Sequence, residues 1–82
     1  MAMKKIKVLC FVDNTDNVKE IICAIKDDSD IENVIIDQIS RIFKSFKRES
    51  SSEFKRCVEA LVSCSPYTWK EYDFFIEKVD LC

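Results

Sequence analysis

The sequence predicts an all-α fold, a small bundle of four to five short helices in a single domain spanning residues 1–82. Two observations predict it. Apolar residues recur at steps of three and four along most of the chain, which is the spacing of one helical face. Short polar clusters separate these periodic segments, as expected for helices joined by connections of two to five residues.

The best-specified helix spans residues 30–48, and we expect the others to pack on it. Ser29 and Glu32 have the spacing of a capping box, in which each side chain bonds a free backbone N–H of the first turn. Acidic residues at the start and basic residues at the end suit the helix dipole. The predicted buried face holds Ile31, Val34, Ile35, Ile39, Ile42, Phe43 and Phe46.

Three further helices are predicted on either side of it. Residues 18–27 carry apolar side chains at i, i+3, i+4 and i+7, after a polar turn. A second helix follows the capping-box pair Ser50 and Glu53 and ends near Cys64. The last begins near Pro66 or Thr68 and runs to about residue 79, with an apolar face of Trp69, Tyr72, Phe75, Ile76 and Val79.

Residues 4–12 fit two structures. Their alternation and β-branched residues favour a strand, although the apolar run 8–12 also suits a buried helical turn. A strand needs a partner, and residues 72–79 are the best candidate. The alternative fold is therefore a small α/β unit in which 5–12 pairs with 72–79 and the middle of the chain is helical.

Composition narrows the function classes. The chain has no Gly, and therefore no Gly-rich loop to hold a nucleotide phosphate. For the same reason, helices must end at Asn, Asp or Ser in place of Gly. Five cysteines at irregular spacing fit reduced thiols, so we expect a cytoplasmic protein without disulfides. The longest apolar run is too short to span a membrane.

Neither catalysis nor metal binding is expected. The chain lacks His, the commonest general base and metal ligand, and no Cys or Ser is spaced to meet a base. Cys57 and Cys64 lie two helical turns apart, too far to hold one zinc ion. We therefore predict no enzyme activity, no cofactor and no metal site.

The predicted function is protein–protein interaction, as an adaptor, regulatory module or small subunit that presents a helical face. Aromatic residues crowd the last predicted helix and cannot all face one interior, and partly exposed aromatics are common interface anchors. They could instead wrap a small core, or belong to a strand buried on both faces. The partner is another protein or a second copy. The predicted contact residues are Tyr67, Trp69, Phe74, Arg41, Lys44, Lys47 and Arg48.

The alternative function is nucleic-acid binding through residues 41–56. Six basic residues lie between positions 38 and 56 against two acidic ones, and such stretches can neutralise phosphates. The net charge of −2 and the placement of bases at a helix end favour a solvated face instead.

Overall fold

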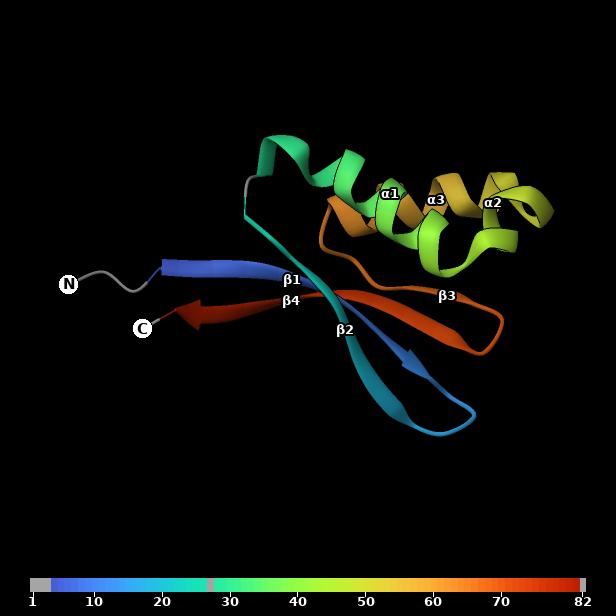
Figure 1. The fold of residues 1–82 in the computed structure, drawn as a ribbon, viewed down its shortest axis with the longest axis horizontal. Helices are drawn as coiled ribbons and strands as arrows, with labels where there is room; N and C mark the ends of the chain where they lie inside the picture. Colours follow the sequence, from blue (N-terminus) through green and yellow to red (C-terminus); the bar gives the residue numbers. More distant parts are fainter. Residues whose placement is uncertain (1–3, 27, 82) are drawn as a thin grey trace.

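The fold is α/β, and the all-α prediction is wrong. The computed structural model describes residues 4–26 and 28–81, which form a four-stranded antiparallel sheet with a layer of helices over one face (Figure 1). The sheet order is β2-β1-β4-β3. In chain order the elements are β1 (Lys4–Asp13), β2 (Val18–Ile25), a 3-10 turn (Asp28–Asp30), α1 (Ile31–Ile42), α2 (Lys44–Glu49), α3 (Ser51–Val62), β3 (Tyr67–Trp69) and β4 (Tyr72–Leu81).

The pairing of the first and last strands confirms part of the alternative prediction. β1 and β4 run antiparallel along their whole length, with Lys5 opposite Asp80 and Val12 opposite Asp73. The two ends of the sequence therefore supply the two central strands of the sheet. The rest of the alternative is wrong, because the middle of the chain is not all helical: β2 pairs with the other side of β1.

β2 replaces the helix predicted over residues 18–27. The register joins Leu9 to Cys23 but Cys10 to Ile21, so Ile22 is an extra residue in a β-bulge. The bulge shifts the alternation of the strand by one position. Apolar residues then fall at i, i+3, i+4 and i+7, although the segment is extended. This spacing imitates helical periodicity.

β3 and β4 replace the last predicted helix. Strand β4 carries apolar side chains on both faces: Phe74 and Ile76 pack against the core, whereas Phe75 and Val79 alternate to the other side. A strand with two apolar faces loses the polar–apolar alternation by which strands are recognised. The spacing of apolar residues in β4 therefore imitates that of an amphipathic helix, and the helix predicted here is wrong.

The two helices predicted from the best periodicity are confirmed. α3 begins at Ser51, directly after Ser50, and α1 begins at Ile31, although neither flanking residue makes a side-chain capping bond. The helix predicted over residues 30–48 is interrupted at Phe43, which separates α1 from α2. The interruption places the Phe43 ring against Tyr72 and Phe74 of β4, with ring centroids 4.7 and 5.1 Å apart.

One hydrophobic core lies between the helices and the sheet. Its aromatic centre is Phe46 of α2, whose ring stacks on Trp69 at a centroid distance of 3.9 Å and meets Phe54 edge-on at 5.3 Å. Such contacts add to the stabilisation from burial alone. The buried members of this core are Leu9, Ile25, Ile31, Ile35, Ile39, Phe46, Phe54, Cys57, Val58, Leu61, Trp69 and Phe74.

Candidate binding surfaces

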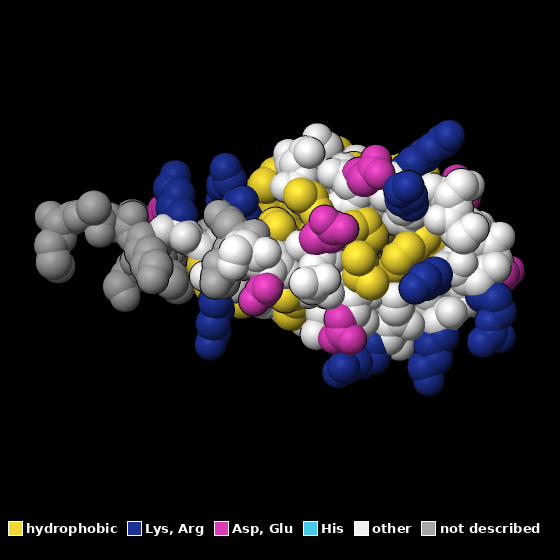
Figure 2. Space-filling model, turned by 90° about the horizontal axis from the view of Figure 1, so that it is seen from above, with side chains coloured by type: hydrophobic (Ala, Val, Ile, Leu, Met, Phe, Trp, Pro, Cys, Tyr) yellow, Lys and Arg dark blue, Asp and Glu magenta, His cyan; other side chains and the backbone are white. Residues whose placement is uncertain are grey.

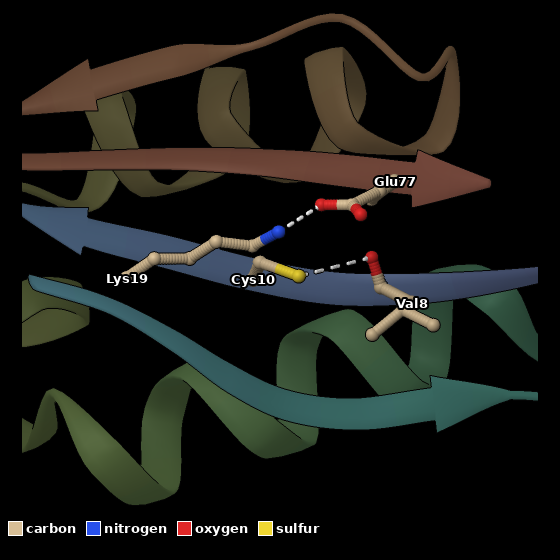
Figure 3. A network of polar contacts seen from close by, with 4 residues as sticks. All are labelled: Val8, Cys10, Lys19 and Glu77. Atoms are coloured by element: carbon tan, nitrogen blue, oxygen red, sulfur yellow. Dashed lines mark hydrogen bonds and ion pairs between the residues drawn. The ribbon is translucent and has the colours of Figure 1, made fainter. Parts of the chain in front are cut away.

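The helices cover one face of the sheet, and no helix of the described residues covers the other, which we call the uncovered face. Figure 3 shows this side: Cys10, Lys19 and Glu77 lie in front of the strands, and the helices lie behind. Strand alternation and the pairing registers assign the remaining members. The uncovered face carries Ile6, Val8, Cys10, Val12, Lys19, Ile21, Ala24, Thr68, Asp73, Phe75, Glu77 and Val79.

This face is largely apolar. Ile21 of β2 is 69% exposed, the highest value among the exposed large hydrophobic residues of the described chain, and Val79 of β4 is also exposed. Val8 and Cys10 lie between them on β1 and are buried by their neighbours. Exposed apolar residues grouped on one face are a mark of protein interaction sites.

An ion pair crosses the middle of the uncovered face. The Lys19 ammonium on β2 donates to the Glu77 carboxylate on β4, above Cys10 of the strand between them (Figure 3). The same ammonium lies 5.7 Å from the centre of the Phe75 ring. The hydrogen bond to Glu77 raises the pKa of Lys19. The two charges of this pair therefore satisfy each other.

A second polar group holds Asp73 at one end of the face. Its carboxylate accepts hydrogen bonds from Thr68 Oγ1 at 2.5 Å and from Asn14 Nδ2 at 2.9 Å. These bonds lower the pKa of Asp73. They tie the β1–β2 turn and β3 to β4, so this carboxylate also has partners within the chain.

Burial disfavours the reactive thiolate form of three of the described cysteines. Cys10, Cys23, Cys57 and Cys64 are free. Burial raises the pKa of Cys10 and Cys23, and it raises the pKa of Cys57 to about 12. Because the thiolate is the nucleophile, a raised pKa makes these thiols poor nucleophiles. Within the described residues, no group of three His, Cys, Asp or Glu side chains could hold a metal ion.

The aromatic residues predicted to contact a partner belong to the core instead. Phe74 is 0% exposed and Trp69 is 4% exposed. Tyr67 packs partly buried against the same core, and this burial raises the pKa of its hydroxyl. Burial leaves Phe74 no exposed surface for a partner and leaves Trp69 only a small exposed part, which lines a hollow described below. The predicted contacts of these residues stay predictions.

The predicted basic contact residues lie on the helix side. Arg41 near the end of α1 and Lys44, Lys47 and Arg48 of α2 are all exposed. Arg41 Nη2 donates to the Asp37 carboxylate at 3.2 Å. Figure 2, seen from the helix side, shows Lys and Arg side chains at the margins and on part of the face, with Asp and Glu side chains mainly towards its middle. The nucleic-acid interface of residues 41–56 stays a prediction.

Sequence reasoning missed the exposure of four apolar side chains, Val18, Ile21, Ile42 and Val79. Their spacing matches 3.6 residues per turn, which predicts the buried face of a helix. For Val79, the signal that could have found it is the excess of apolar residues on both faces of β4. An excess of this kind leaves some apolar side chains outside the core.

A groove lies at the far end of the sheet from the termini, between the β1–β2 hairpin, the α1–α2 junction and the β3–β4 turn. It consists of two hollows of about 550 and 390 Å³ that share Ile42, Phe43 and Tyr72, and we call it the end groove. The larger hollow also contains Phe11, Val18 and the acidic residues Asp13, Asp16 and Glu20. The smaller adds Lys44, Ser45, Trp69, Lys70 and Glu71.

Comparison with known proteins gives no relative: no family model, curated protein or solved structure matches the chain. Nor is any helix in the described part of the chain long and apolar enough to cross a membrane.

Proposed function

We propose that this chain is a non-enzymatic protein–protein interaction domain that binds another protein through its uncovered face. The observation that carries the proposal is the exposure of Ile21, a large apolar side chain on the edge strand β2, on a sheet face that no helix of the described residues covers. The free thiols of the described residues support a location in the cytoplasm, where thiols stay reduced.

The charges of the uncovered face define the chemistry of the partner. Lys19 and Glu77 pair with each other, and Asp73 is bonded by Thr68 and Asn14. The face therefore offers apolar area without an unsatisfied charge. A partner with an apolar, uncharged helix or sheet surface fits it. Burying the Ile21 side chain would contribute about 2 kcal/mol to such a complex.

The test compares two exposed isoleucines. The wild-type domain is used as bait, the captured protein is identified and purified, and its affinity is measured for the wild type, Ile21→Ser and Ile42→Ser. Ile42 is exposed but lies in the end groove, so it is the matched control. We expect Ile21→Ser to weaken binding about thirtyfold, the equivalent of about 2 kcal/mol, and Ile42→Ser to leave it unchanged.

Two results would contradict the proposal. Equal affinity of the partner for the wild type and Ile21→Ser would remove the uncovered face as its site. Light scattering that shows a dimer of the wild type, with Ile21→Ser monomeric, would make a second copy the occupant in place of a different protein.

A further inference from the structure

We propose that the end groove binds a segment of another protein in which a Lys or Arg side chain lies beside a bulky apolar side chain. This site is separate from the uncovered face and does not depend on the function proposed for it. The inference stands on two features of the groove, its apolar floor and its unpaired carboxylates.

The apolar feature is formed by side chains that remain partly exposed to solvent in the folded domain. Val18 at the start of β2 is 48% exposed and Ile42 at the end of α1 is 46% exposed, and both line the larger hollow. Between them the rings of Phe43 and Tyr72 lie 4.7 Å apart. A bulky apolar side chain placed here would cover exposed area on both sides of the hollow.

The charged feature is the wall formed by Asp13, Asp16 and Glu20. Asp13 Oδ1 accepts the backbone N–H of Thr15 at 2.9 Å, which orients this carboxylate within the turn. Among the residues that the structure describes, no Lys or Arg forms an ion pair with any of the three.

The nearest base in the sequence cannot neutralise this wall. Lys19 lies between Val18 and Glu20, but strand alternation turns it to the uncovered face, where it pairs with Glu77. The carboxylates are therefore left for an external cation. A cationic group next to the apolar floor matches both features, because charge complementarity sets register and orientation at such sites.

A peptide suits the groove better than a small cation does. The two hollows share the lining residues Ile42, Phe43 and Tyr72, so they are neighbours, with the acidic wall in one and Lys44 and Lys70 in the other. Lys70 sits 4.7 Å from the centre of the Trp69 ring and 3.9 Å from the Glu49 carboxylate. An extended segment could lie along this length with its basic side chain at the acidic end.

The experiment uses three fluorescein-labelled hexapeptides as probes: alternating lysine and leucine, alternating glutamate and leucine, and alternating lysine and serine. Binding is followed by fluorescence anisotropy at low and high salt. We expect only the lysine–leucine peptide to bind, with affinity that falls as salt rises. Backbone amide NMR shifts should change at residues 16–20 and 42–44.

Variants of the protein locate the site. Glu20→Lys should weaken the lysine–leucine peptide about tenfold, because it places a positive charge in the acidic wall. Glu59→Lys changes the net charge equally at an exposed site on α3, outside the groove, and should leave affinity within about twofold. Ile42→Ser should weaken binding without changing its salt dependence.

Each opposing result overturns the inference. Failure of the lysine–leucine peptide to bind removes the site, and equal binding of the glutamate–leucine peptide removes the role of the acidic wall. Equal binding of the lysine–serine peptide removes the apolar floor. Equal weakening by Glu20→Lys and Glu59→Lys would show attraction to net charge alone. None of these results bears on the uncovered face, which Ile21→Ser tests separately.

Discussion

Three residues adopt left-handed backbone conformations that Gly would adopt without strain, and the chain contains no Gly. Asn17, Cys64 and Lys70 all have positive φ, at 56°, 61° and 55°. Asn tolerates this region, whereas Cys and Lys are strained in it. The clearest case is Cys64, which ends α3 in a Schellman motif: Cys64 N–H donates to Leu61 O and Ser65 N–H donates to Ala60 O. Cys64 occupies the position where helices usually have Gly.

Replacing Cys64 by Gly should therefore stabilise the domain. We expect a gain of about 1 kcal/mol in the free energy of unfolding, since Gly removes the left-handed penalty but adds some entropy to the unfolded chain. Urea denaturation followed by circular dichroism measures the gain. Cys57→Gly is the matched control and should be destabilised by about 2 kcal/mol or more, because Cys57 is buried inside α3. A lower urea midpoint for Cys64→Gly would contradict this account of the helix end.

At the scale of elements, local periodicity predicted the structure only where nothing interrupted it. α1 and α3 keep an unbroken apolar stripe and are predicted as helices, although the first prediction continues through Phe43 to residue 48, where the structure has a separate helix α2. In β2 the bulge at Ile22 shifts the alternation, and in β4 apolar residues occupy both faces. Each effect gives a strand the spacing of a helix. The pairing of β1 with β4 was predicted as an alternative because the extended pattern of residues 4–12 required a partner strand.

The candidate surfaces were less predictable than the elements. Whether an apolar side chain is buried depends on which face of the sheet the helices cover, and no local pattern encodes that choice. Trp69 and Ile21 show the consequence: the aromatic residue predicted to contact a partner is in the core, and an isoleucine predicted to be buried is exposed. The end groove likewise combines side chains from three separate parts of the chain.

Two phenylalanines on opposite faces of the layered structure test this assignment of faces. Phe46 of α2 is fully buried and stacks on Trp69, whereas Phe75 lies on the uncovered face and is only partly buried. We expect Phe46→Ala to cost about 3–5 kcal/mol in the free energy of unfolding, because it leaves a cavity in the core. Phe75→Ala should cost less than about half as much. Urea denaturation of both variants measures the difference, and equal losses would show that the two faces are equally buried.

The whole molecule has a sheet whose spatial order differs from its chain order. The strands lie as β3-β4-β1-β2, so the central pair joins the two ends of the sequence, and the N- and C-termini emerge at the same end of the molecule (Figure 1). The central pairing therefore closes a loop that contains every other element. Closing a loop of this length loses chain entropy before the contacts between β1 and β4 can form. This loss slows folding.

A circular permutant should remove that cost. Joining the C-terminus to the N-terminus through a short Gly/Ser linker, and opening the chain between Ser65 and Pro66, gives the strand order β3, β4, β1, β2. Both residues at the opening are exposed and lie outside helices and strands. Every strand then pairs with its neighbour in sequence, so all sheet contacts become local hairpins. We expect the same circular dichroism spectrum and a folding rate increased about tenfold, measured by stopped-flow dilution from urea. The fluorescence of Trp69 provides the signal. A permutant that keeps the spectrum but folds at the rate of the natural chain would show that the β1–β4 closure does not limit folding, and that formation of the helix layer over the sheet is the slower step.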